Sequence, residues 1–215
     1  MATKSKNVSA ENAFQQSRDF VSLDVGSPQL RGCATRVDTG WDLKAGGADI
    51  WEKSDQFHFL CKQVSGDFDI AVRAESFTPA HLYSKAGLMI RETLNGDSPH
   101  LMFLVFSDNS PRNNNLGAYE AQFRSTAGGD CQAIYPAVKP PAPPEFPAAY
   151  PNSWLRLQRR GDRFSAFVST DGKAWKLYAI QQLVLPDVVY AGLALTSHHP
   201  LVEAKAAFRN YTELT

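Results

Sequence analysis

Polar side chains that could bind a hydroxylated ligand recur at alternate positions in three segments of this chain. Gln56 and His58 alternate with Phe57 and Phe59, and the segments 85–91 and 118–124 show the same alternation of polar and apolar residues. A period of two is typical of β-strands, in which successive side chains point to opposite faces. If the three strands share a sheet, one open face carries the polar set Gln56, His58, Lys85, Arg91, Glu120, Gln122 and Arg124.

Residues can also be assigned to the edges and to the reverse side of that face. Trp51 is expected at one edge and His198 at the other. The apolar residues of the three strands are expected in the core of a sandwich, because one parity of each strand is buried there. They are Phe57, Phe59, Cys61, Ala86, Leu88, Ile90, Tyr119, Ala121 and Phe123.

These residue types suit the recognition of a sugar. Arginine supplies fork-shaped donors, amides and carboxylates accept from hydroxyls, and an aromatic ring offers an apolar face. A hydrogen bond to a charged group contributes about 1.5–3 kcal/mol, so three or four of them would give a useful affinity. The alternative is a solvated sheet face on which Arg91 and Glu120 form a surface ion pair worth about 0–1 kcal/mol.

Signals for catalysis and for metal binding are weaker. Glycoside hydrolysis needs two carboxyl groups about 5–9.5 Å apart, and Glu120 is the acid that the alternation places on the predicted face. The sequence has no nucleophile elbow and no phosphate-binding loop. Asp67 and Asp69 share a parity and could help to hold a structural calcium ion, but exposed strand acids explain them more simply. We therefore predict no catalytic residue, no metal site and no cofactor.

Composition narrows the class of protein and of partner. The chain has 215 residues, of which 43% are hydrophobic, and 22 basic residues balance 22 acidic ones. This predicts one globular domain without a field that attracts nucleic acid or an anionic membrane. No apolar segment follows the N-terminus, so a cytoplasmic location is expected. The three cysteines, Cys33, Cys61 and Cys131, are expected to be free thiols, with a disulfide from Cys33 or Cys131 as the alternative.

The order of strands and turns predicts an all-β sandwich or barrel. Residues 1–17 are expected to form a flexible arm, and residues 18–215 a single domain. Strands are predicted at 56–62, 67–75, 84–92, 100–107, 118–124, 154–160, 163–170, 174–180, 188–197 and 203–211. Asp171-Gly172 predicts a type I′ hairpin turn. The proline-rich stretch 131–153 predicts a stiff surface loop, whose Tyr135, Phe146 and Tyr150 are expected to pack it onto the sandwich rather than line a groove.

Several of these segments resemble one family. Ala48-Asp49-Ile50-Trp51, 55–59, 66–69 and 85–91 are similar to segments of the regulation of enolase protein family. The likeness continues at 154–157 with Gly161, at 169–172 with Trp175, and at 192–198, and it covers about residues 40–210. It implies a concanavalin A-like jelly roll of the lectin and glucanase superfamily, with two antiparallel sheets, one of them bent into a concave face. Members occur as single intracellular proteins and as modules of secreted carbohydrate-active enzymes.

The residues and the resemblance together predict a jelly-roll protein that binds a carbohydrate or sugar-like metabolite on its concave face without catalysis. Lys85, Arg91 and Arg124 would donate hydrogen bonds, Gln56, His58, Glu120 and Gln122 would orient hydroxyls, and Trp51 would stack. A protein-interaction regulator of a metabolic enzyme is the alternative. A glycoside hydrolase comes third, because it would require a second carboxylate near Glu120 and the chain lacks the E-x-D-x-x-E run that glucanases of this superfamily carry on one strand.

Overall fold

The computed structural model describes residues 20–110, 118–134 and 146–214, and within them every regular element is a strand. The strands are β1 (Val21–Val25), β2 (Cys33–Val37), β3 (Gly40–Gly47), β4 (Phe57–Ser65), β5 (Phe68–Thr78), β6 (Lys85–Arg91), β7 (His100–Val105), β8 (Tyr119–Arg124), β9 (Gln132–Ile134), β10 (Ser153–Arg160), β11 (Arg163–Ser169), β12 (Lys176–Gln182), β13 (Val188–Thr196) and β14 (His199–Glu213). The predicted arm at 1–17 lies outside the described residues. No helix in the described ranges has the length and hydrophobicity needed to cross a membrane.

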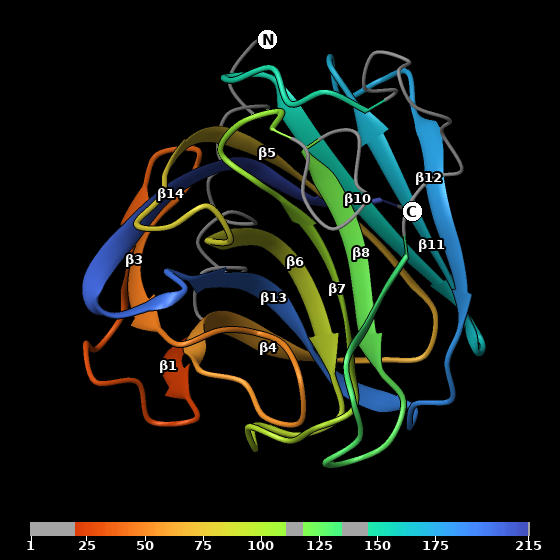
Figure 1. The fold of residues 1–215 in the computed structure, drawn as a ribbon. Coiled ribbons are helices and arrows are strands. Elements are labelled where there is room, and N and C mark those ends of the chain that lie inside the picture. Colours follow the sequence, from red (N-terminus) through yellow and green to blue (C-terminus); the bar gives the residue numbers. More distant parts are fainter. Residues whose placement is uncertain (1–19, 111–117, 135–145, 215) are drawn as a thin grey trace, which may run out of the picture.

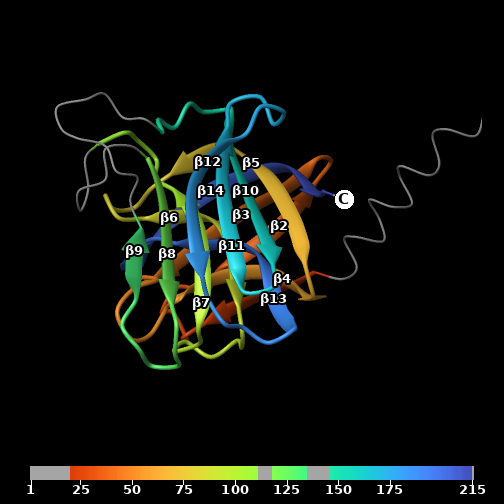
Figure 2. The same ribbon diagram turned by 90° about the vertical axis from the view of Figure 1, so that its right-hand side faces the viewer.

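These strands form two antiparallel sheets of seven strands each. Sheet A has the order β1-β4-β13-β6-β7-β8-β9, and sheet B the order β12-β11-β10-β5-β14-β3-β2. Figure 1 shows the curved strands of sheet A, and Figure 2 shows β10, β11 and β12 of sheet B side by side with β8 and β9 to their left. The predicted jelly-roll sandwich of two antiparallel sheets is confirmed.

The ten predicted strands are confirmed. Four strands were not predicted: β3, which lies between β14 and β2, and three others that share one property. β1, β2 and β9 each lie at the edge of a sheet. An edge strand has one ladder partner and leaves many side chains in solvent, as the mostly exposed β2 shows. Their alternation of polar and apolar residues is therefore too weak to identify them from the sequence.

The hairpin between β11 and β12 differs from the predicted type I′ turn. Gly172 has a φ of 71°, but Asp171 is not among the residues with positive φ. Instead the Asp171 carboxylate accepts from the backbone N–H groups of Lys173 and Ala174, at 2.8 and 2.9 Å. An aspartate can bond to the backbone just beyond itself, and here those bonds shape the turn.

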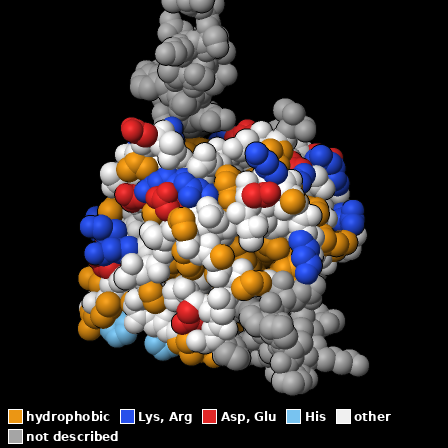
Figure 3. Space-filling model, turned by 90° about the horizontal axis from the view of Figure 1, so that it is seen from above, with side chains coloured by type: hydrophobic (Ala, Val, Ile, Leu, Met, Phe, Trp, Pro, Cys, Tyr) orange, Lys and Arg blue, Asp and Glu red, His pale blue; other side chains and the backbone are white. Residues whose placement is uncertain are grey.

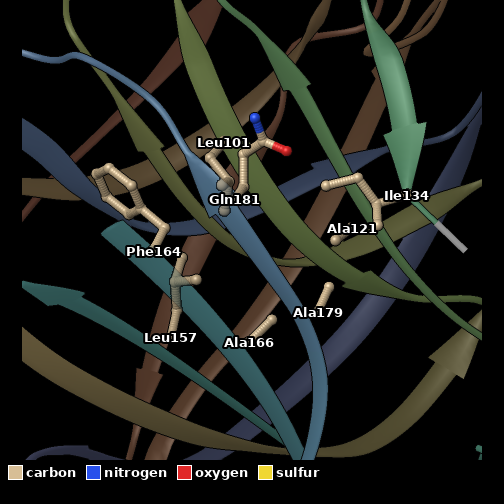
Figure 4. Close-up of a pocket in the computed structure, with 8 residues that line it drawn as sticks. All are labelled: Leu101, Ala121, Ile134, Leu157, Phe164, Ala166, Ala179 and Gln181. Atoms are coloured by element: carbon tan, nitrogen blue, oxygen red, sulfur yellow. The ribbon is translucent and has the colours of Figure 1, made fainter. Parts of the chain in front are cut away.

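The core fills the space between the two sheets. Figure 4 shows Leu101, Ala121 and Ile134 of sheet A facing Leu157, Phe164 and Ala166 of sheet B. The space left among these side chains is about 10 Å³ and apolar, so it is no wider than a single water and offers it no polar partner. Ala86, Leu88, Ile90, Tyr119 and Ala121 are buried, as predicted.

Aromatic side chains fix the described parts of the proline-rich loop to the sandwich. Phe146 is buried, with its ring 4.9 Å from that of Tyr178. The Tyr150 hydroxyl donates to the Phe106 carbonyl at 2.5 Å. Both contacts agree with the predicted packing of the loop, whereas Tyr135 and the rest of 135–145 lie outside the described residues.

The surface mixes charges of both signs. In Figure 3, Lys and Arg side chains lie beside Asp and Glu side chains. Arg209 contacts Asp42 at 2.7 Å and Glu75 at 3.0 Å.

All three cysteines are free: Cys33 is exposed, and Cys61 and Cys131 are buried. Burial raises the pKa of the Cys61 and Cys131 thiols to about 12, so both are protonated at neutral pH.

Candidate functional site

A segment between β3 and β4, residues 48–56, lies across the face of sheet A that points away from sheet B. We call it the covering segment. Its Ile50 side chain is buried, and the Ile50 carbonyl accepts hydrogen bonds from Lys85 Nζ at 2.9 Å and Gln122 Nε2 at 2.7 Å. The side chains predicted to form an open concave face therefore meet protein backbone there.

The two arginines predicted as ligand donors, Arg91 and Arg124, bind the covering segment and the neighbouring loops. Arg124 forms a double contact with Asp55, at 2.7 and 2.8 Å, and Arg91 lies 3.1 Å from the same carboxylate. All three side chains are fully buried. Arg124 also donates to the Glu52 carbonyl at 2.9 Å, and Arg91 to the Thr93 carbonyl at 2.9 Å. Their predicted exposure on an open face is wrong, because they bind the loops that cover it.

His100 completes this buried cluster and remains neutral. Its Nδ1 lies 3.6 Å from Asp55 and 3.3 Å from Arg124 Nη1. Burial lowers the pKa of His100 to about 3, because it disfavours the charged imidazolium more than Asp55 favours it. Burial also lowers the pKa of Arg91, whereas for Arg124 the bonds to Asp55 outweigh burial and raise it.

The predicted parity of β4 is wrong. Cys61 lies opposite Gly192, and Gly192 opposite Met89, so Phe57, Phe59 and Cys61 share a face with Lys85 and Arg91. The Arg91 guanidinium accordingly lies 5.1 Å from the Phe57 ring. These apolar side chains are buried on the face of sheet A that points away from sheet B, instead of between the sheets.

His58 consequently points toward sheet B and not to the predicted polar face. It is buried, and its ring nitrogens contact Asp24 and Ser22, each at 2.8 Å. Gln56 is half-buried at the end of the covering segment, where its side chain accepts from the Ala48 N–H at 3.3 Å. Both residues thus stabilise local structure in the places that the fold gives them.

One end of the face stays open as a pocket of about 230 Å³. Four of the nine predicted site residues line it: Trp51, Lys85, Glu120 and His198. They come from the covering segment, from β6, from β8 and from the turn before β14. The other five, Gln56, His58, Arg91, Gln122 and Arg124, are not among its lining residues.

Asp49 organises the pocket. Its Oδ1 lies 2.8 Å from Lys85 Nζ and its Oδ2 lies 3.1 Å from His198 Nδ1. Burial alone would raise the pKa of Asp49, but His198 and Lys85 together outweigh it and hold this pKa below its usual range. Asp49 is therefore ionised at neutral pH and fixes the buried Lys85 ammonium, which also lies 5.0 Å from the centre of the Trp51 ring.

Three lining residues were not predicted as site residues: Asp49, Tyr83 and Phe106. Asp49 belongs to the motif Ala48-Asp49-Ile50-Trp51, but it lies outside the strands whose alternation defined the predicted face. Phe106 continues the alternation of His100, Met102 and Leu104, so its face could have been inferred from β7. Tyr83 lies in an irregular turn between β5 and β6, where no periodicity marks it.

The two acids considered for calcium have other contacts. Asp69 accepts from Arg156 at 2.7 and 2.6 Å and from Gln158 at 2.6 Å. Asp67 accepts from the Gly161 N–H at 2.7 Å. Within the described ranges no group of three potential metal ligands comes together, and these contacts give both acids a structural role.

The comparisons with known proteins concern the fold. No family model and no curated protein matches the chain. A functionally unknown protein from Saccharomyces cerevisiae matches with a TM-score of 0.66 and 18% identity, over 92% of this chain and 97% of that one. Carbohydrate binding module CBM66 from Bacillus subtilis matches with a TM-score of 0.55 and 15% identity, over 90% and 99%.

A xylan β-1,4-xylosidase from Bacillus halodurans matches with a TM-score of 0.51 and 15% identity, over 80% of this chain but 32% of the enzyme. The chain therefore resembles about a third of that protein. At these identities the likeness extends to the fold, and the resemblance to the regulation of enolase family stays a prediction. In fold, the chain is a concanavalin A-like jelly-roll sandwich that resembles a carbohydrate binding module and part of a xylosidase.

Proposed function

We propose that this protein binds a carbohydrate or sugar-like small molecule in the pocket beside the covering segment, without converting it. The observation that carries the proposal is the convergence of Asp49, Lys85 and Glu120 with the rings of Trp51 and Tyr83 in one hollow. A few directed polar groups among aromatic walls are typical of small-molecule sites. The similarity in fold to a carbohydrate binding module supports the choice of ligand.

The side chains have distinct roles in this proposal. The Lys85 ammonium has three donors. It contacts Asp49 and the Ile50 carbonyl, and in this proposal it also donates to a ligand hydroxyl. Glu120 accepts from hydroxyls, since a carboxylate has about four lone-pair sites. Trp51 presents an apolar ring to the C–H groups of a sugar.

The test is a glycan array followed by calorimetry with the best glycan. Trp51→Ala should weaken binding at least tenfold, because it removes the stacking surface without touching the buried cluster. Trp175→Ala is the matched control, since Trp175 is also half-buried but packs against Trp154 on sheet B. A folded protein that binds no glycan, or equal losses in both variants, would refute the proposal.

Hydrolysis is less well supported by the same pocket. Asp49 supplies the second carboxylate that a hydrolase would require near Glu120. A hydrolase pairs an ionised carboxylate with a general acid that is protonated near neutral pH. His198 and Lys85 keep Asp49 ionised, so Asp49 does not supply that acid. We expect no release of reducing sugar from any glycan that binds.

A protein-interaction regulator of a cytoplasmic metabolic enzyme is the second candidate. One observation favours it: Leu177 and Ile180 on β12 are exposed, as are Val184 in the loop that follows and Val188 at the start of β13. Exposed apolar patches often mark protein contacts. If this function holds, one protein should be captured from lysate by the wild-type chain and lost with the double substitution Leu177→Ser/Ile180→Ser.

A further inference from the structure

Two rim segments of the pocket, residues 79–84 and 197–203, lie against each other. The Ser84 hydroxyl donates to the Ser197 carbonyl at 2.5 Å, and the rings of His81 and His198 stack with their centres 4.5 Å apart. The same two segments supply Tyr83 and His198 to the pocket wall. Other side chains of these two segments therefore lie close to the pocket.

The rim carries aliphatic side chains in solvent. Leu82 is 46% exposed, Leu201 59% and Val202 46%. They make up three of the eight large hydrophobic residues that are exposed in the described part of the chain. At the lower left of Figure 3, histidine side chains adjoin hydrophobic ones at the edge of the molecule. Apolar residues gathered beside a binding site are more informative than scattered ones.

Local hydrogen bonds order the backbone of both rim segments. His199 Nδ1 accepts from the Leu201 N–H at 3.1 Å, and the Ser197 hydroxyl donates to the His199 carbonyl at 2.6 Å. On the other segment, Ser84 Oγ accepts from the His81 N–H at 2.9 Å. Because the backbone is already ordered, covering this rim would cost little conformational entropy.

We infer that the ligand is an amphiphilic glycoside, whose sugar occupies the pocket and whose aliphatic aglycone lies over Leu82, Leu201 and Val202. The inference rests on the proposed carbohydrate site and specifies its ligand class. A polar pocket continuous with an aliphatic rim matches a molecule that has both parts. A plain sugar would leave the rim in water, whereas an alkyl chain removes apolar surface on both partners from water.

The experiment compares methyl and octyl glycosides of glucose, galactose and mannose by calorimetry, below the micelle concentration. The octyl glycoside of a bound sugar should bind at least tenfold tighter than its methyl glycoside, which corresponds to burying a few methylene groups. Leu201→Ser/Val202→Ser should remove this gain and leave the methyl glycoside within twofold of its wild-type affinity. Val184→Ser, an exposed valine outside both rim segments, should change neither affinity.

The outcomes separate this inference from the proposed function. Methyl and octyl glycosides binding equally would overturn the inference and leave the sugar site in place. If neither the methyl nor the octyl glycosides bind, both the inference and the proposed sugar site are overturned. Equal binding of octyl tri(ethylene glycol) ether would show a rim that takes any alkyl chain, which also overturns it. A wild-type dimer that Leu201→Ser/Val202→Ser dissociates would assign the rim to a second copy of the chain instead.

Discussion

At the scale of single residues, basic side chains on one sheet face have two different roles. Lys85 lies at the pocket, and Arg91 from the other end of the same strand lies in a fully buried cluster with Asp55. Strand alternation correctly predicted that Lys85, Arg91, Glu120, Gln122 and Arg124 share a face. It could not predict which of them meet solvent, because that depends on a segment that forms no strand.

Arg91→Ala tests this division. Removing one partner of a buried ion pair leaves the other charge unsatisfied, which costs about 3–5 kcal/mol. We expect the free energy of unfolding in urea to fall by about that amount, which makes Arg91 a structural residue and not the ligand donor expected from sequence. Arg163→Ala, on the exposed start of β11, should cost less than about 0.5 kcal/mol. Equal small losses in the two variants would contradict the buried cluster.

At the scale of elements, the covering segment determines what the jelly roll can bind. It takes the hydrogen bonds of Gln122 and Arg124, and its Ile50 side chain is buried. The β4 prediction failed for this reason: both faces of that strand are buried, so its alternation does not distinguish the side facing sheet B from the side beneath a loop. A strand buried on both faces loses the polar–apolar contrast on which such predictions depend.

Gly47 is where the chain leaves β3 to form this segment, and Gly47→Ala should displace it. Gly47 has a φ of 117°, and an added Cβ would lie 2.2 Å from the Gln56 carbonyl oxygen. The backbone must shift, so we expect a loss above 2 kcal/mol, more than the roughly 1–2 kcal/mol of a left-handed conformation alone. In Gly47→Ala, the backbone amides of residues 48–56 should exchange hydrogen faster than in the wild type.

Gly66→Ala is the matched control for Gly47. Gly66 has a φ of 68°, but its added Cβ would have no neighbour nearer than 3.8 Å. It should therefore show the conformational cost alone, with unchanged exchange in the covering segment. If Gly47→Ala were no more harmful than Gly66→Ala, the close approach of Gly47 to Gln56 would not determine the position of the segment.

At the scale of the whole molecule, the fold could be predicted well and the site only in part. Central strands alternate clearly, and they led to the sandwich and to a shared face for Lys85 and Glu120. Trp51 and His198 were expected at opposite edges of that face, whereas they line the same pocket as Lys85 and Glu120. The buried cluster could not be predicted, because Asp55, Arg91, His100 and Arg124 come together through loops and three different strands. Residues far apart in sequence and outside one strand share no spacing that would reveal their contact.

This cluster joins the covering segment to β6, β7 and β8, so its titration should affect unfolding of the entire sandwich. His100 has a pKa of about 3 in the folded protein and about 6.5 in the unfolded chain. Between these values the unfolded chain binds a proton that the folded protein does not. The free energy of unfolding is therefore fully retained above pH 6.5 and falls as the pH drops toward 3. From pH 7 to pH 5 the loss at this one group should be about 2 kcal/mol.

Urea unfolding at pH 7 and pH 5 measures this loss, and a variant without the imidazole identifies its source. His100→Gln should be less stable at pH 7 but lose about 2 kcal/mol less than wild type on acidification, since glutamine does not titrate. His199→Gln, at the half-exposed start of β14, should keep the wild-type difference. If His100→Gln lost as much stability as wild type between the two pH values, the proton uptake would come from another group. The neutral buried imidazole would then not account for the acid sensitivity of the sandwich.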